Sequence, residues 1–377
     1  MAFFCIVMAF ISMHFKTIEY KRGYDYKVEA KKIMSGALNM LKEEADRIYD
    51  GARPQINDAT LDPLKSGLIF YCDDSEGKLS SKLSTLNPNF SALIVDLFID
   101  AGLEKGDDIA IAFTGSLPGA NVAVLSACKS MGIKPTIITS VSASNWGACD
   151  YENFSWLDME DELKLFFKND DYKSIAASVG KGGDIGNDLQ KESIDEIEKK
   201  ISILAGSNIS DNEQNLAYHV DKRVNKYWGY DNSDIKLYVN VGGGVASLGT
   251  YPGIKQRMGY LSVDSLKVLK ESKQINGNSV MAKMATDYGV PAINITNIEQ
   301  LIEGKLNLID VGVSDDSSLG MKPDMIEEER LFSQEKYNLI VVIPCLVASL
   351  ALVLSVGLYS HLQIKRRMSS YEPDSIS

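Results

Sequence analysis

The chain has 377 residues, which is enough for one large domain or two ordinary domains with a buried core. Its 45% hydrophobic and 24% charged residues are typical of a globular protein. With 51 acidic and 39 basic side chains the net charge is −12, which argues against nucleic acid as a partner but allows a local basic pocket.

The five cysteines form no CxxC pair, so the sequence predicts neither a zinc ribbon nor a thioredoxin-like site. Cys72, Cys128 and Cys149 lie between the apolar ends of the chain. We expect them to be small buried hydrophobic residues rather than a disulfide with a spare thiol. His219 is the only histidine in this central part, which excludes a site built on two histidines. We therefore expect no metal and no cofactor.

The first segment, residues 1–16, is almost entirely apolar but short for a membrane span. It lacks the basic region and the cleavage site of a signal peptide. The sequence therefore predicts an uncleaved N-terminal membrane anchor, with a buried hydrophobic arm as the alternative.

The following segments lead into a central βαβ unit. Residues 24–49 carry apolar side chains at helical spacing, residues 52–86 are rich in turns, and residues 89–101 form a second predicted helix. From 107 to 144 the pattern is strand, glycine turn, helix and strand. Such a unit places a helix N-terminus at the carboxyl edge of a parallel sheet, where backbone N–H groups hold a carboxylate or a phosphate.

Candidate ligand-binding residues lie just after the two strands of this unit. They are Thr114, Gly115, Ser116 and Gly119 in the first turn, and Ser144, Asn145 and Trp146 in the second loop. Ser116 stands where a nucleophile elbow would place its serine, but GSLPG lacks the G-x-S-x-G spacing. A helix cap is the simpler role for Ser116. An ordinary surface loop is the alternative for the tryptophan-bearing segment.

A second strand–glycine crossing is predicted over residues 174–186. The sequence GKGGDIG has the composition of a phosphate loop but not the G-x-x-x-x-G-K-[ST] pattern. Its candidate anion-holding residues are Lys181, Gly182, Gly183 and Asp184, with a flexible turn as the alternative. Lys181 and Asp184 are also candidate catalytic groups. His219, on a helix predicted over 213–228, is a further candidate base, although a lone histidine on a helix is more often a bystander.

The third crossing has a strand at residues 235–241 that runs into Gly242, Gly243 and Gly244. Three glycines let the backbone approach a ligand closely, and a tight turn is the alternative. Strands alternating with helices predict an α/β fold with a parallel, doubly wound-like sheet and helices on both faces. The sequence leaves open whether the body has two lobes divided near 170–230.

The last apolar segment, residues 339–358, contains no charged residue and has the length of about 20 residues that a bilayer span needs. We predict a transmembrane helix over 337–360, with a buried core helix as the alternative. Three basic residues follow at 365–367. The tail from 361 to 377 is therefore expected to be cytoplasmic, and the body from 24 to 336 extracytoplasmic.

Two stretches carry a family resemblance. Residues 87–148 read NPNFSALIVDLFIDAGLEKGDDIAIAFTGSLPGANVAVLSACKSMGIKPTIITSVSASNWGA, and residues 238–249 read YVNVGGGVASLG. They resemble the poly-gamma-glutamate system protein family, a membrane-anchored component found with bacterial poly-gamma-glutamate synthesis and export systems. The resemblance implies a role in making, moving or anchoring this polymer, with the membrane, other membrane subunits and the polymer as partners. It implies no catalytic residue.

Two functions remain open from the sequence. The first is a binding or assembly component of a polymer system of the cell envelope, in which glycine turns hold γ-glutamyl carboxylates, a phosphate or another small anion. The second is a hydrolase or transferase that acts on γ-glutamyl bonds. In that case Ser116 would be the nucleophile, and His219, Lys181 or Asp184 its base.

Overall fold

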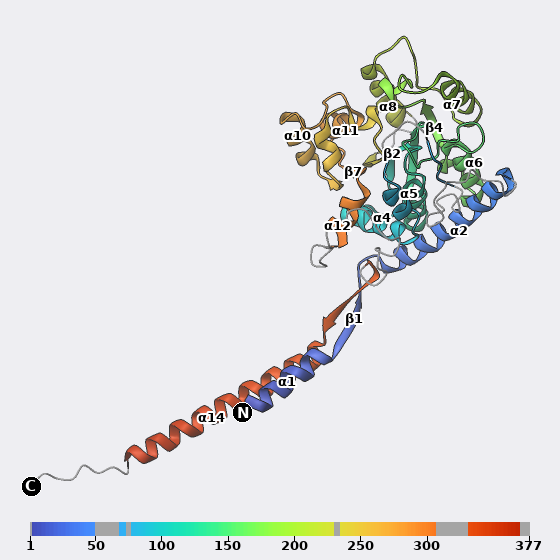
Figure 1. The fold of residues 1–377 in the computed structure, drawn as a ribbon. Coiled ribbons are helices and arrows are strands. Elements are labelled where there is room, and N and C mark those ends of the chain that lie inside the picture. The colour runs from blue at the N-terminus through green and yellow to red at the C-terminus, as the bar shows by residue number, and fades with distance from the viewer. Residues whose placement is uncertain (1, 50–67, 73–76, 230–233, 307–330, 370–377) are drawn as a thin grey trace, which may run out of the picture. The chain divides into compact units, whose positions relative to one another are not determined.

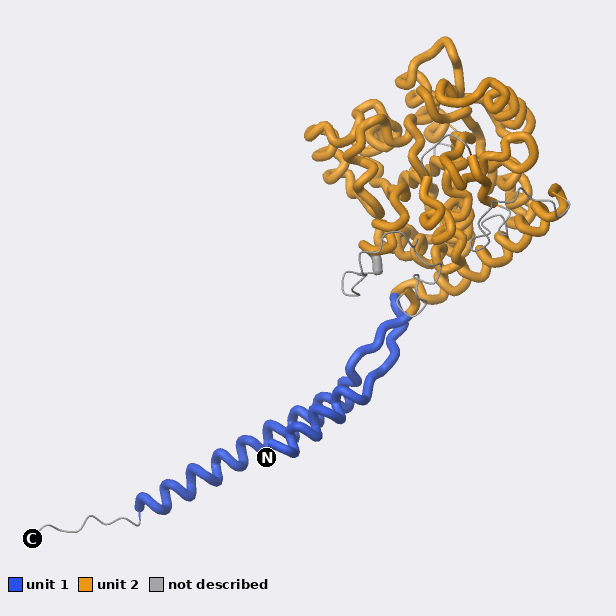
Figure 2. Tube along the Cα trace, viewed as in Figure 1, with its two compact units in different colours: residues 1–21, 333–377 blue, residues 22–332 orange. Residues whose placement is uncertain are grey.

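The structure of the protein is a computed structural model, which describes residues 2–49, 68–72, 77–229, 234–306 and 331–369 (Figure 1). The chain divides into two compact units, Met1–Lys21 with Ser333–Ser377, and Arg22–Phe332 (Figure 2). Much of the turn-rich segment 52–86 lies outside the described residues, as do residues 320–330, which the sequence predicts to be a linker to the last apolar segment.

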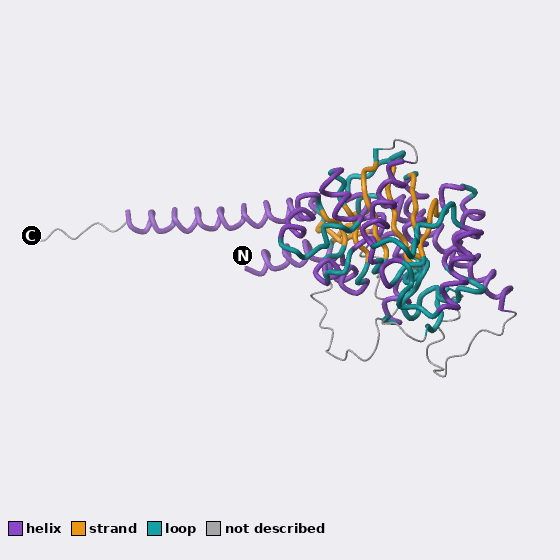
Figure 3. Tube along the Cα trace, turned by 90° about the horizontal axis from the view of Figure 1, so that it is seen from above, coloured by secondary structure: helices purple, strands orange, loops and turns teal. Residues whose placement is uncertain are grey.

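The larger unit is built on one six-stranded sheet in the order β4-β3-β2-β5-β7-β6. Its strands are β2 (Asp108–Thr114), β3 (Lys134–Ser140), β4 (Ser174–Ser178), β5 (Ile235–Val241), β6 (Gly259–Leu261) and β7 (Ala292–Ile295). Strands from both sides of residues 170–230 therefore pair in the same sheet. Figure 3 shows the strands lying among the surrounding helices.

Five of the six strands run parallel, and the edge strand β6 pairs antiparallel with β7. The predicted α/β class and parallel core are confirmed, but the sheet is mixed at this edge. The strand order reverses beside β2, which pairs with β3 on one side and with β5 on the other. In open α/β sheets a crevice forms outside the carboxyl ends of the strands at such a reversal.

Alternate side chains of β2 enter two hydrophobic cores. Ile109, Ile111 and Phe113 belong to one core, whereas Ala110 and Ala112 belong to the other. The helices that contribute to the first core are α2 (Tyr24–Tyr49), α4 (Asn89–Asp100), α5 (Pro118–Met131), α6 (Trp156–Phe167) and α12 (Ile298–Leu306). Those of the second core are α8 (Leu216–Gly229), α9 (Val245–Leu248), α10 (Val263–Glu271) and α11 (Val280–Tyr288). Helices thus flank the sheet, and α7 (Lys191–Leu204) packs in a smaller cluster with β4 and α6.

Helix α5 has the start and the end that its sequence predicts. Pro118 occupies the first helical position, where its missing N–H costs no hydrogen bond. Gly132 ends the helix at φ 70°, a left-handed conformation that glycine adopts without steric cost. Because both signals are local, this helix could be delimited from the sequence alone.

A buried carboxyl group, Glu160 on α6, joins α6 to β3 and β4. Its oxygens accept hydrogen bonds from Trp156 Nε1 at 2.7 Å, Thr139 Oγ1 at 3.1 Å and the Ser174 backbone N–H at 3.1 Å. Burial nevertheless dominates and raises the pKa of Glu160 to about 7. The folded state therefore binds this proton more tightly than the unfolded chain does.

We expect Glu160→Ala to lower the free energy of unfolding by about 3 kcal/mol, because it leaves several buried donors without an acceptor. The Glu160 proton contributes fully to the free energy of unfolding below a pH of 4.5, the ordinary pKa of a glutamate. This contribution is lost as the pH rises through about 7. Urea denaturation of wild type and Glu160→Gln between pH 4.5 and 7.5 would measure this. Wild type should lose stability relative to the Gln variant, and parallel pH profiles would contradict the assignment.

The smaller unit contains α1 (Ala2–His14), β1 (Lys16–Tyr20), β8 (Ser333–Tyr337) and α14 (Leu339–Ser369). Strands β1 and β8 pair antiparallel, and α1 lies along α14 (Figure 2). Among the described helices only α14 is long and apolar enough to cross a membrane. It has no buried residue, as expected of a span rather than a core helix, and it continues beyond the predicted end at 360.

The N-terminal membrane helix predicted over residues 1–16 is not supported. Helix α1 has 13 residues. At 1.5 Å per residue it is about 20 Å long, which is shorter than the hydrocarbon core of a bilayer, about 30 Å.

Candidate functional site

A cleft of about 720 Å³ opens at the carboxyl edge of the sheet, where the strand order reverses. Residues that follow four different parallel strands line it. They are Thr114 at the end of β2 and Ser116 after it, Ser142 and Ser144 after β3, Lys181 and Gly182 after β4, and Gly242, Gly243 and Gly244 after β5. The three predicted strand–glycine crossings therefore meet at one cleft.

Two predicted ligand-binding glycines serve packing instead. A Cβ atom on Gly119 would lie 2.6 Å from the Thr85 backbone oxygen, so this glycine lets the start of α5 approach the end of α3 (Leu79–Thr85). A Cβ atom on Gly115 would collide with the Val141 backbone oxygen at the end of β3. Neither residue lines the cleft.

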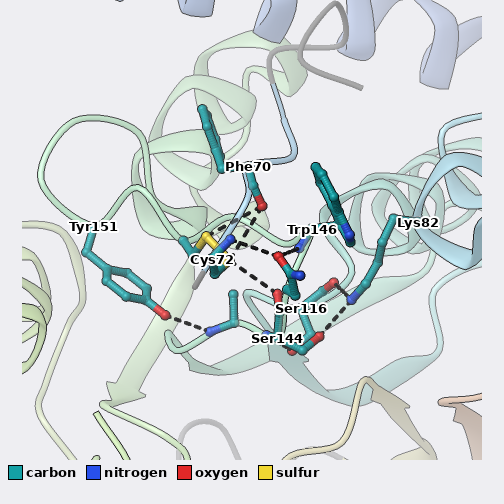
Figure 4. Close-up of a disulfide and its surroundings, with 10 residues drawn as sticks. Phe70, Cys72, Lys82, Ser116, Ser144, Trp146 and Tyr151 are labelled. Atoms are coloured by element: carbon teal, nitrogen blue, oxygen red, sulfur yellow. Dashed lines mark hydrogen bonds between the residues drawn. A yellow bond between two sulfur atoms is a disulfide. The ribbon is translucent and has the colours of Figure 1, made fainter. Parts of the chain in front are cut away.

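Helix α3 carries Lys82, one of several cleft residues that the sequence patterns did not indicate. This lysine is only 4% exposed, and no described residue forms an ion pair with it. Its Nζ donates a hydrogen bond to Ser144 Oγ at 2.8 Å and another to the Ser116 backbone oxygen (Figure 4). Burial without a countercharge lowers the pKa of Lys82 to about 7, so a substantial fraction is neutral near neutral pH.

The sequence of this helix contains a short helical pattern of leucines. Leu79, Leu83 and Leu86 recur at a spacing of three to four residues, which is typical of one helix face. Seven residues are too few for this periodicity to stand out in a serine-rich and turn-rich region.

Ser116 neither caps α5 nor meets one of its predicted bases among the described contacts. Its Oγ accepts a hydrogen bond from the Ser144 backbone N–H at 2.9 Å, and α5 has no side-chain cap. The hydroxyl that does contact a base is that of Ser144. The two serines and Lys82 thus form one connected group that lines the cleft.

Asp184 lies in a buried ion pair rather than in the cleft. Its Oδ2 is 2.8 Å from Nη2 of Arg223 on α8, and both side chains are at most 3% exposed. The same guanidinium nitrogen donates to Ser140 Oγ at 3.0 Å and to Ser178 Oγ. Asp184 therefore anchors the loop that brings Lys181 and Gly182 to the cleft, and a direct ligand contact has no geometric support.

His219 is also fully buried away from the cleft. Its Nδ1 lies 3.3 Å from the Gly183 backbone oxygen, and its Nε2 lies 3.2 Å from the Asp211 backbone nitrogen. With Nδ1 protonated, the ring donates to the first and accepts from the second. His219 thus connects two loops, and Gly183 does not line the cleft either.

The glycine turn after β5 is held by buried polar side chains. Thr114 Oγ1 donates to the Val241 backbone oxygen at 3.2 Å, and Asn240 Nδ2 donates to the Gly242 backbone oxygen at 2.8 Å. Gly242 has φ +92°, and a Cβ atom there would collide with Thr114 Oγ1. Glycine is therefore required at this position, both for its conformation and for the close approach of β2.

Cys72 and Cys149 form a disulfide, with Cα atoms 6.2 Å apart (Figure 4). The prediction that these two are reduced hydrophobic residues is wrong, whereas Cys128 is indeed buried and free. Local patterns could not indicate the pairing, because 77 residues separate the two cysteines. Next to the bridge, Asn145 Oδ1 accepts hydrogen bonds from the Cys72 and Trp146 backbone N–H groups at 2.8 and 3.0 Å.

These contacts explain why Asn145 and Trp146, both predicted ligand-binding residues, do not line the cleft. The Asn145 side chain joins its loop to the segment before α3 through the hydrogen bond from Cys72. The Trp146 ring packs edge-on against Tyr71, with ring centroids 5.1 Å apart. The disulfide and these contacts together hold the loop that presents Ser144.

The charge of the cleft opposes that of the whole chain. Among the residues that the structure describes, four lysines line it, Lys78, Lys82, Lys181 and Lys255, together with one carboxylate, that of Asp188. Lys78 is 3.0 Å from Glu299, and Asp188 accepts a hydrogen bond from the Gly182 N–H. Leu117 also lines the cleft immediately before α5, so the positive end of that helix dipole lies at the cleft. This combination suits a negatively charged ligand.

Searches with family models, among curated proteins and among solved structures found no match to this chain.

Proposed function

We propose that this protein is a membrane-anchored component of a poly-gamma-glutamate system, and that its cleft binds a γ-glutamyl segment. The observation that carries the proposal is the lysine-lined cleft in a chain of net charge −12. A local excess of positive charge in an acidic protein selects for anions near that cleft. The resemblance of residues 87–148 and 238–249 to the family supplies the identity of the anion.

The chemistry of the cleft suits the polymer. Each γ-linked glutamate carries a free α-carboxylate and one peptide group. Lysines satisfy the carboxylates, while the Ser116 hydroxyl can donate to a peptide oxygen. The hydroxyl protons of Thr114 and Thr296 are already donated within the protein, so their oxygens can only accept from a peptide N–H. A phosphate would use the same lysines, so it serves as a competitor in the test below.

We propose that Arg22–Phe332 lies outside the cytoplasm. Helix α14 is long enough to span a membrane, and the basic residues Arg366 and Arg367 lie in its last turn, which by the positive-inside rule places that end in the cytoplasm. The disulfide between Cys72 and Cys149 supports this orientation, because such bonds persist in oxidising compartments.

Binding of oligo-γ-glutamate to the full-length protein in nanodiscs, measured by isothermal titration calorimetry, tests the proposal. We expect Lys255→Gln to raise the Kd roughly fivefold, because an exposed ion pair contributes at most about 1 kcal/mol. Lys267→Gln is the matched control, since Lys267 is an exposed lysine on α10 that does not line the cleft. Inorganic phosphate should compete only weakly.

Absence of binding at millimolar oligomer would contradict the proposal, as would equal effects of the two lysine substitutions. Displacement of the oligomer by micromolar phosphate would assign the cleft to a phosphorylated ligand instead.

The alternative enzyme with Ser116 as nucleophile is not favoured by the geometry. Its hydroxyl accepts a backbone N–H, and Asp184 and His219 have other partners.

A further inference from the structure

We propose that Ser144 and Lys82 form a nucleophile–base pair that cleaves or transfers an acyl group bound in the cleft. This inference rests on the proposed function for its substrate class, an amide or ester of a γ-linked acidic peptide. It assigns the reacting hydroxyl to Ser144 rather than to Ser116. The pair itself stands on geometry, since Lys82 Nζ lies 2.8 Å from Ser144 Oγ inside the cleft.

Lys82 meets the requirements of a general base. A lysine can accept a proton only when it is neutral, which requires burial and no nearby carboxylate. Lys82 is 4% exposed, and Glu299 on the adjoining helix α12 pairs with Lys78 instead. On α5, which packs against α3, the only charged residue is Lys129 in the last turn. In the described part of the chain, the other charged groups that line the cleft are three lysines and Asp188.

The second contact of Lys82 directs its lone pair. A neutral amine has two N–H bonds and one lone pair, and one N–H donates to the Ser116 backbone oxygen. The Ser144 hydroxyl can then donate its proton to the lone pair of Nζ, which reverses the direction of this hydrogen bond. Ser144 itself is fixed by its backbone N–H, which donates to Ser116 Oγ at 2.9 Å. Ser116 is therefore a positioning residue.

The reaction balances with these two groups and water. Ser144 Oγ attacks the acyl carbon and forms a C–O bond, while its proton passes to Lys82 Nζ. When the tetrahedral intermediate collapses, the C–N or C–O bond to the leaving group breaks, and Lys82 returns the proton to the leaving amine or alcohol. Water then attacks the Ser144 ester through the same base and releases the acid; an acceptor amine in place of water gives transfer.

The surroundings suit the charge that this reaction develops. Leu117 precedes the first helical residue of α5, so the positive end of the α5 dipole lies at the cleft beside the two serines. The glycine turn after β5 lines the cleft without side chains at Gly243 and Gly244. An acyl group can approach Ser144 there.

A fluorophosphonate probe tests the pair in the full-length protein in nanodiscs. An activated serine attacks the phosphorus and expels fluoride, and peptide mass spectrometry locates the adduct. We expect the adduct on Ser144, with a rate that rises with pH through about 7 as Lys82 loses its proton. Ser144→Ala should abolish labelling, and Lys82→Met should slow it at least 100-fold. Lys82→Arg should also slow it, because arginine keeps its charge but cannot act as a base.

Ser116→Ala should slow labelling while the adduct stays on Ser144. Ser202→Ala, an exposed serine on α7, is the control and should label like wild type. Thermal unfolding reports whether each variant is folded. An adduct on another serine, no adduct on folded wild type, or a wild-type rate in Lys82→Met would overturn the inference.

The same experiments separate the two proposals. Labelling of Ser144 without oligo-γ-glutamate binding would keep the catalytic pair and reject the ligand. Binding without labelling would keep the ligand and reject the pair.

Discussion

Reduction of the Cys72–Cys149 disulfide should lower the free energy of unfolding of the larger unit by about 4 kcal/mol. The bridge closes a loop of 77 residues, and the loss of chain entropy in the unfolded state grows with loop length. Chemical denaturation of the full-length protein in nanodiscs with and without a phosphine reductant measures this difference. The Cys72→Ser/Cys149→Ser variant should reproduce the reduced state.

The same double variant provides the control for this measurement. It should show no further loss of stability when reductant is added, because the other cysteines are free. A shift of similar size in both proteins would trace the effect to something other than the bridge. We also expect weaker oligo-γ-glutamate binding after reduction, since the bridge holds the loop that carries Ser144.

Elements with strong local signals could be predicted from the sequence. The predicted helix over 24–49 and the predicted strand over 235–241 have the observed bounds of α2 and β5. In each case apolar periodicity or a continuous apolar run is bounded by turn residues. The three strand–glycine crossings were found for the same reason. That they line one cleft is a finding of the structure, because the sequence did not predict the order of the strands.

Short elements and long-range pairings could not be predicted. The three residues of β6 and the seven of α3 give too little periodicity, so the antiparallel edge and Lys82 were missed. A disulfide depends on the distance between two chain segments after folding, which composition does not reveal. The roles of Asp184 and His219 depend on Arg223 and on backbone groups of other loops, which no local pattern identifies.

Asp184→Ala should lower the free energy of unfolding by about 3–5 kcal/mol. The substitution would leave the Arg223 guanidinium, which is 2% exposed, as a buried charge without a counterion. Ser140 and Ser178 would still accept hydrogen bonds from it, but hydroxyl groups do not neutralise it. Urea denaturation measures the difference.

The matched control is Asp221→Ala on the same helix as Arg223. Asp221 pairs with Lys283 at the surface, where its side chain is 56% exposed. An exposed pair of this kind contributes at most about 1 kcal/mol. Equal losses for the two substitutions would show that burial of the Asp184–Arg223 pair has no energetic consequence.

Replacing both members of the pair separates the cost of an uncompensated charge from the loss of the aspartate itself. Asp184→Ala combined with Arg223→Met removes the buried charge, so it should recover part of the stability. Oligo-γ-glutamate binding should not recover with it. Lys181 at φ 47° and Asp184 at φ 75° adopt conformations that non-glycine residues rarely keep unless other contacts hold them. With the ion pair gone, the loop loses a contact that holds these conformations, and Lys181 is no longer fixed at the cleft.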